Sequence, residues 1–146
     1  GFNYRMTELQ AVLGVSQMER LDEFVTLRHK CQNRYDELLK NLPIITSYQD
    51  LDSYSALHLY PIQIEDNKVS KTRQKIFQEL RDNGIGVNVH YIPVHIQPYY
   101  QNLGFKKGDV PNSEGYYDRV ISIPIFSSMS ICQQDLIVKN LKNIII

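Results

Sequence analysis

One long helical pattern sets the scale of any fold that this sequence can adopt. Side chains keep steps of three and four positions from 18 to 42, at Met18, Leu21, Phe24, Val25, Arg28, Cys31, Tyr35, Leu38 and Leu42. Pro43 would end the helix. At 1.5 Å per residue, such a helix is roughly 37 Å long. In a chain of 146 residues, it must either cross the whole domain or pack against something outside the chain.

Three further helices carry start or stop signals. Thr7 and Gln10 have the spacing of a capping box, in which each side chain satisfies a backbone N–H of the other residue. Ser70 is expected to cap a helix with an apolar stripe of Ile76, Phe77 and Leu80, and Gly84 to end it. A last helix is expected from about Ser130. Gly14, inside the first of these helices, would mark the close approach of another backbone.

Four segments rich in β-branched and aromatic residues predict short strands, at 44–47, 57–64, 85–91 and 121–125. Pro61 cannot donate a ladder hydrogen bond, which predicts an edge strand or a bulge there. A long ordered loop is expected over 93–111, with a short helix at Tyr99 and Tyr100, and another helix over 113–119. The order of elements favours an α+β domain with a small, mostly antiparallel sheet and helices on one face. A Rossmann domain is disfavoured, because no glycine fingerprint joins a strand to a helix.

Composition excludes several functional classes. Lys plus Arg equals Asp plus Glu at 16 each, so a basic face for nucleic acid has little support. The apolar runs are too short for a membrane span. Cys31 and Cys132 lie far apart without a CxxC pair, which argues against a disulfide framework or zinc site and predicts a reducing, cytoplasmic compartment. The start at Gly1 without Met is interpreted as an internal cut in a longer protein.

Among the four histidines, those in the segment 90–95, His-Tyr-Ile-Pro-Val-His, are the best candidates for a site. They fall where a predicted strand enters a proline-bounded loop, and imidazole and phenol can bond phosphate, sugar hydroxyl or carboxylate groups. No metal is expected, because a metal site needs a third ligand. His29 is expected on a solvated helix face, and His58 as a packed or rim residue at the start of a strand.

The first six residues form the other dense polar segment. Asn3, Tyr4 and Arg5 offer an amide, a phenol and a guanidinium, and the guanidinium suits bidentate contact with a carboxylate or phosphate. The alternative is a helix lead-in with Tyr4 or Met6 as a hydrophobic staple, and the residues alone favour it.

Several segments resemble the DegT/DnrJ/EryC1/StrS aminotransferase family. Residues 1–11 resemble its G-[YF]-N-x-R-[ML]-[TS]-x-[LIM]-Q-A segment, residues 58–60 its H-L-[FY] strand, and residues 84–95 its G-[IV]-x-x-x-x-H-Y-x-P-[LV]-H segment. Residues 99–100 and 121–124 follow in the expected order, so the likeness covers essentially the whole chain. The run from Val87 to Tyr100 is most like the PseC type, which aminates a UDP-linked 4-keto-6-deoxy sugar on the way to pseudaminic acid.

The resemblance implies a type I pyridoxal-phosphate (PLP) fold in a homodimer. This chain would be the smaller C-terminal domain over residues 1–146, with residues 1–17 as the tail of the large-domain and interface segment. The reaction would transfer an amino group, from glutamate as donor, to a nucleotide-linked 4-keto-6-deoxy sugar.

The resemblance also assigns roles to individual residues. Asn3 would reach the cofactor phosphate of the partner subunit, and Arg5 would lie near the bound substrate. His90, Tyr91 and His95 would line the sugar-nucleotide side. The lysine that holds PLP would lie upstream, in the large domain that binds most of the cofactor.

No catalytic residue is expected within this chain. Its nine lysines all fall in polar helices or turns, whereas a lysine that binds PLP covalently needs a partly desolvated setting. The fragment alone is therefore expected to be inactive. Two alternatives stay open: a dehydratase of the same family, with histidine in place of the lysine, and a non-catalytic binding or dimerisation module.

Overall fold

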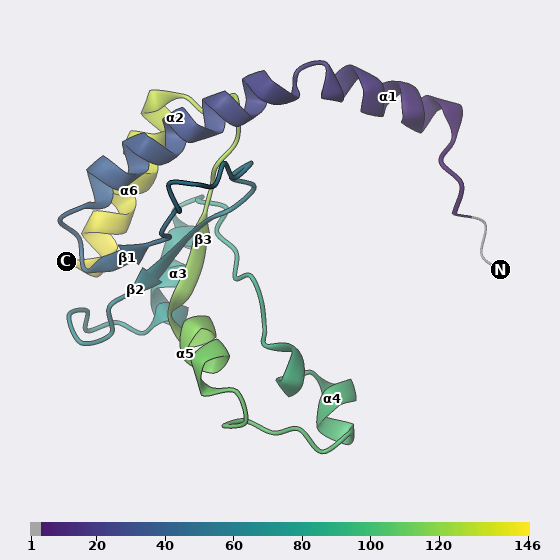
Figure 1. Ribbon diagram of the computed structural model, residues 1–146. Helices are drawn as coiled ribbons and strands as arrows, with labels where there is room; N and C mark the ends of the chain where they lie inside the picture. The colour runs from purple at the N-terminus through teal and green to yellow at the C-terminus, as the bar shows by residue number, and fades with distance from the viewer. Residues whose placement is uncertain (1–3) are drawn as a thin grey trace.

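The computed structural model describes residues 4–146 and confirms the predicted α+β class. Along these residues the elements are α1 (Glu8–Met18), α2 (Leu21–Leu39), β1 (Ile44–Thr46), β2 (Tyr60–Ile64), α3 (Arg73–Asp82), the 3-10 helix η1 (Val94–Ile96), α4 (Pro98–Asn102), α5 (Pro111–Arg119), β3 (Val120–Ile123) and α6 (Ile131–Ile145). Figure 1 shows the sheet beneath α2 and α6, with α1 projecting to one side and α4 and α5 lower in the view.

The predicted continuous helix over 18–42 is wrong at both ends. The chain turns between α1 and α2, where Arg20 leaves the helical region with φ −111° and ψ 7°. At the other end, α2 stops at Leu39, and a backbone hydrogen bond of 2.9 Å from Leu42 N–H to the Leu39 carbonyl closes a tight turn before Pro43. Leu42 is nevertheless buried, so it reaches the core from this turn rather than from the helix.

The sheet is antiparallel, in the order β1-β2-β3. Because β2 lies in the centre, the prediction of an edge strand at Pro61 is wrong for the strand as a whole. Pro61 lies beyond the last β1 pair, Thr46 with Ile62, and its carbonyl accepts a hydrogen bond of 3.3 Å from Ser47 Oγ. In a strand, the backbone N and the carbonyl of one residue point to the same neighbouring strand. The Pro61 nitrogen, which has no proton to donate, therefore points to the β1 side, at a position where β1 has already ended.

The predicted strand over 85–91 is reduced to a single bridge. Asn88 pairs with Ser122 through two backbone hydrogen bonds, of 3.1 Å and 2.8 Å. Val87 is buried, but Tyr91 is 72% exposed, so residues 87 and 91 do not lie on one buried face, as they would in a regular strand. Strand β3 has only four residues, and the segment 85–91 separates from its outer edge after the single Asn88–Ser122 pair.

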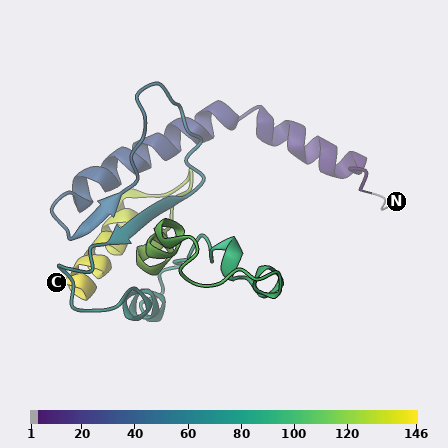
Figure 2. The ribbon, with the colours of Figure 1, turned by 60° about the horizontal axis from the view of Figure 1, so that its bottom comes forward.

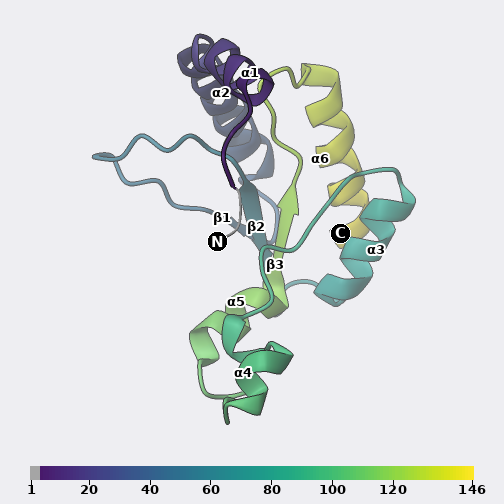
Figure 3. The same ribbon diagram turned by 90° about the vertical axis from the view of Figure 1, so that its right-hand side faces the viewer.

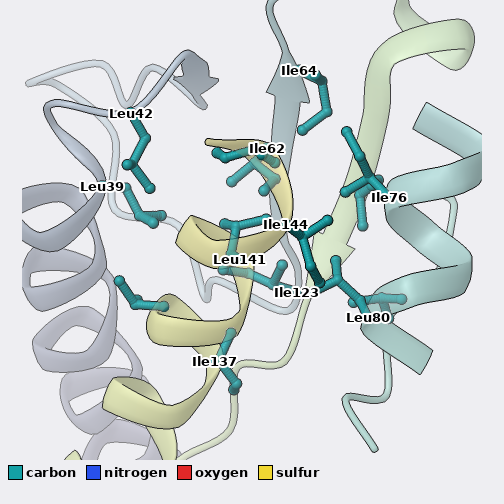
Figure 4. Close-up of a cluster of buried hydrophobic side chains, with 14 of the residues drawn as sticks. Leu39, Leu42, Ile62, Ile64, Ile76, Leu80, Ile123, Ile137, Leu141 and Ile144 are labelled. Atoms are coloured by element: carbon teal, nitrogen blue, oxygen red, sulfur yellow. The ribbon is translucent and has the colours of Figure 1, made fainter. Parts of the chain in front are cut away.

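Helices α3 and α6 cover one face of the sheet, as predicted. Figure 3 shows α3 and α6 on the same side of the strands, and α6 contacts both α2 and α3. Figure 4 shows apolar side chains from β2, α3, α6 and the α2 end meeting in one core, among them Ile62, Ile76, Leu80, Leu141 and Ile144.

The helix starts were predicted with mixed success. Both side-chain bonds of the capping boxes form, at Thr7 with Gln10 and at Ser130 with Gln133. The cap of α3 is Thr72 instead of the predicted Ser70, and its hydroxyl accepts a hydrogen bond from the Lys75 N–H. Gly84 takes the predicted left-handed conformation, with φ 77°.

Helix α1 buries none of its residues within the described chain. Figures 1 and 2 show it extending away from the sheet and the other helices. Its apolar side chains are 62% to 80% exposed, at Leu9, Val12, Leu13, Val15 and Met18. A side chain added at Gly14 would meet nothing within 4 Å, so the close backbone approach predicted there is not made within residues 4–146.

Candidate functional site

The segment 90–95 leads from the Asn88 bridge into η1, next to the sheet edge. His90 Nδ1 lies 2.9 Å from the hydroxyl of the buried Ser122, which ties the imidazole to β3. The Tyr91 ring meets the His90 ring edge-on, with 4.7 Å between centroids. The peptide bond between these two residues is cis. His90 is thus half-buried and anchored, while Tyr91 presents its phenol outward.

His95 lies deeper and has a carboxylate partner. Its Nε2 donates to Glu114 Oε1 over 2.7 Å, and both residues are 8% exposed. Glu114 also accepts hydrogen bonds from the Gly108 N–H, at 2.8 Å and 3.0 Å to its two oxygens, and from the Val110 N–H at 3.4 Å. The hydrogen bond from His95 first, and that from Gly108 next, hold the pKa of Glu114 below its ordinary value.

Sequence reasoning missed Glu114. The residue stands in the first turn of α5, where an acidic side chain is common because it faces the positive end of the helix dipole. The sequence signal therefore matches that of an ordinary exposed helix start, and only the folded loop 104–110 reveals the burial.

An apolar cavity of about 370 Å³ adjoins His95. Its walls come from η1, α4, the loop after α4 and α5, at Val94, His95, Tyr100, Phe105, Val110 and Ser113. The predicted short helix at Tyr99 and Tyr100 is present as α4. Tyr100 and Phe105 meet edge-on with 6.3 Å between centroids, which makes this wall aromatic. The cavity can hold an apolar ring beside a small number of polar groups.

The other predicted residues lie at the far N-terminal end. Asn3 falls outside the described residues, so its predicted role stays a prediction. Arg5 is exposed in the extended segment before α1. Figures 1 and 2 show α1 and that segment well away from η1 and α4. A single copy of the chain therefore does not bring residues 4–7 to the segment 90–95.

The prediction that His29 lies on a solvated helix face is wrong. It is half-buried, its ring stacks on Tyr54 with 4.4 Å between centroids, and its Nε2 donates to the Ser55 carbonyl over 2.8 Å. Arg28 donates to the Leu57 carbonyl over 3.2 Å. These contacts attach the 47–59 loop to α2. His58 is exposed and precedes β2 by two residues.

Among residues 4–146, no group of three or more His, Cys, Asp or Glu side chains is placed to hold a metal ion. Within the same range, no helix is both long and apolar enough to cross a membrane. None of the nine lysines is buried, and the most covered, Lys71, pairs with Glu79 at 2.7 Å.

Comparison with known proteins agrees on one family. The sequence profile of the DegT/DnrJ/EryC1/StrS aminotransferase family matches residues 1–142. The spore coat polysaccharide biosynthesis protein SpsC of Bacillus subtilis is 38% identical over 148 aligned positions, which cover 99% of this chain and 38% of that protein. The chain thus spans less than half the length of this relative.

Solved structures give the same answer for the fold. A putative sugar aminotransferase of Streptococcus pneumoniae, Spr1654, solved in apo, PLP and PMP forms, is 29% identical with a TM-score of 0.88 over 96% of this chain and 35% of its own in the apo form. Helicobacter pylori PseC, an aminotransferase involved in the biosynthesis of pseudoaminic acid, is 27% identical with a TM-score of 0.89 over 99% of this chain and 39% of its own.

Proposed function

This chain belongs to the DegT/DnrJ/EryC1/StrS aminotransferase family, and we propose that it is the C-terminal domain of an enzyme that transfers an amino group to a nucleotide-linked keto sugar. The observation that carries the proposal is the structural match to a putative sugar aminotransferase solved with PLP and with PMP, over 96% of this chain in both forms.

The chain can complete a PLP site but cannot anchor the cofactor. A lysine that binds PLP needs a desolvated environment, and none of the lysines here is buried. The remainder of the protein would supply that lysine. When bound, PLP supplies the electron sink for amino transfer. Asn3 would hold the cofactor phosphate through its amide, and Arg5 would bind a carboxylate or phosphate through its guanidinium.

We place these two residues in the site of a second subunit. The projection of α1 away from the sheet supports this placement, because none of the α1 residues is buried within the described chain. The proposed assembly is therefore a homodimer whose sites each combine residues of both subunits.

The sugar-nucleotide side of the site would be lined by His90, Tyr91 and His95. His90 is anchored to Ser122, Tyr91 is exposed, and His95 adjoins an aromatic cavity. Imidazole and phenol groups suit the hydroxyl and phosphate groups of a nucleotide sugar.

For the substrate, we propose a UDP-linked 4-keto-6-deoxy sugar of the pseudaminic acid route, with glutamate as the amino donor. The resemblance of residues 87–100 to the PseC type and the structural match to PseC support this choice.

The test uses the full-length protein that carries this chain. It is incubated with PLP, L-glutamate and the UDP-linked 4-keto-6-deoxy sugar, and the products are analysed by mass spectrometry. We expect an amino sugar together with an equal amount of 2-oxoglutarate. Loss of water from the sugar without nitrogen uptake would indicate the dehydratase instead. Binding of the sugar without any reaction would indicate a non-catalytic module.

A further inference from the structure

We propose that Glu114 is a positioning residue that holds His95 in one tautomer, so that His95 Nδ1 presents a hydrogen-bond acceptor to the aromatic cavity beside α4 and α5. This inference deepens the proposed function and rests on it for the identity of the ligand.

The geometry leaves one arrangement for the neutral imidazole. A carboxylate can only accept hydrogen bonds, so the 2.7 Å contact requires the proton on His95 Nε2. The Gly108 and Val110 N–H groups donate to the same carboxylate, mainly to the oxygen that contacts His95, and so restrain its orientation. Nδ1 then carries the lone pair.

Nδ1 is the ring nitrogen available to a ligand. It makes no hydrogen bond to any residue from 4 to 146, and it is not among the fully covered polar atoms that lack a partner. His95 is itself one of the residues that line the cavity, together with Tyr100, Phe105 and Ser113.

The ligand group must therefore be a hydrogen-bond donor attached to a ring. In a nucleotide sugar, such a donor is either a sugar hydroxyl or the N–H of the nucleobase. Among residues 4–146, no lysine or arginine lines the cavity, so the described lining does not suit the diphosphate.

The first measurement examines the 146-residue chain without cofactor or turnover. Long-range ¹H–¹⁵N spectra of histidine-labelled protein at about pH 9 report which nitrogen carries the proton, because an ordinary imidazole is neutral well above about pH 6.5. We expect His95 entirely as the Nε2–H form. A clear population of the Nδ1–H form would overturn the proposal.

The second measurement adds probes to the same sample. Uridine tests the nucleobase as the source of the donor, and the free 6-deoxyhexose fucose tests the sugar. We expect one of them to shift the Nδ1 signal and to leave Nε2 unchanged. If neither probe shifts Nδ1 up to its solubility limit, the acceptor role of His95 is wrong.

Variants of Glu114 separate its positioning of His95 from its support of the loop 104–110. Glu114→Gln keeps an acceptor for His95 and should retain probe binding within about threefold, whereas Glu114→Ala should weaken it at least tenfold, a loss of about 1.4 kcal/mol. Glu79→Ala is the matched control: it removes a carboxylate of α3 that pairs with Lys71, outside the cavity lining, and should leave binding unchanged. Equal losses in Glu114→Ala and Glu79→Ala would overturn the proposal.

In the full-length enzyme, Glu114→Ala should raise KM for the nucleotide sugar and leave the half-reaction with glutamate unchanged. This split keeps the proposal testable if the variant of the isolated chain does not fold. Because the tautomer and the probes are measured without turnover, a failed transaminase assay would count against the proposed function and not against this inference.

Discussion

Pro61 lies opposite Ser122 in the sheet, and Ser122 directs its backbone N–H and carbonyl to Asn88 on the other side. Residues paired across an antiparallel ladder alternate between bonded and non-bonded pairs. Pro61 therefore occupies a non-bonded pair, and its missing N–H costs the central strand nothing on the β3 side.

Replacing Pro61 should consequently have little effect on stability. We expect Pro61→Val to change the free energy of unfolding by less than about 1 kcal/mol, since no hydrogen bond is gained or lost. The neighbouring control Ile62→Ala removes a fully buried side chain and should cost about 2–5 kcal/mol. Urea unfolding measures both values. A Pro61→Val loss as large as that of Ile62→Ala would contradict this account of the ladder.

The same strand illustrates what the sequence could and could not predict. The helix caps at Thr7 and Ser130 were predictable, because their hydrogen bonds are made within four residues. The central position of β2 was not predictable, because proline fits there only since Pro61 forms a non-bonded pair with Ser122 and lies beyond the last β1 pair. The segment 85–91 has the composition of a strand, but the single pair that it makes depends on the length of β3.

The candidate site shows the same division. The segment 90–95 was singled out from its residue types, yet its partners Ser122 and Glu114 lie 32 and 19 positions away from His90 and His95. Neither partner belongs to a local pattern, so residue spacing alone could not identify them. The role of His29 was missed for the same reason, since its partner Ser55 is 26 positions away.

The His29 contacts predict how the 47–59 loop is held. Replacing His29 with Ala removes the stack on Tyr54 and the hydrogen bond to the Ser55 carbonyl. Limited proteolysis should then cleave within this loop several times faster than in the unchanged protein, because local opening exposes the backbone. His58→Ala is the matched control, since His58 is an exposed residue of the same loop and is not the histidine that bonds Ser55. Equal cleavage rates in the two variants would exclude the anchoring role.

We expect the Glu114 carboxylate to contribute to the free energy of unfolding and to lose this contribution in acid. Its pKa is lowered in the folded protein, mainly by the hydrogen bond from His95. The carboxylate therefore stabilises the fold above the ordinary carboxyl pKa of about 4.3, and that stabilisation is lost as the pH falls through the lower, folded pKa. We expect the free energy of unfolding to fall less steeply from pH 5 to pH 3 in Glu114→Gln than in the unchanged chain. Parallel curves from urea unfolding would show that the pKa of Glu114 is not linked to folding.

The exposed lysines predict that this chain does not bind PLP covalently. When the 146-residue chain is incubated with PLP and reduced with borohydride, mass spectrometry should detect only trace, scattered adducts. The full-length protein should give one adduct per subunit, at a lysine outside this chain. A stoichiometric adduct at Lys71, the most covered lysine described, would show that the chain holds its own anchor.

Because α1 is exposed in this chain, we expect a substitution on it to affect the stability of the full-length protein but not that of the isolated chain. Leu13 is 67% exposed here, so Leu13→Gln should change the stability of the isolated chain by less than about 0.5 kcal/mol. A row of exposed apolar side chains on one helix is typical of a surface that another part of the protein covers. In the full-length protein the same substitution should therefore lower the melting temperature or weaken the dimer, which thermal unfolding and sedimentation velocity measure.

Leu141→Ala is the matched control. Leu141 is fully buried in the core, so this substitution should destabilise both proteins. If Leu13→Gln has no effect in the full-length protein, α1 is not covered there, and the placement of Arg5 in a partner subunit's site loses its support.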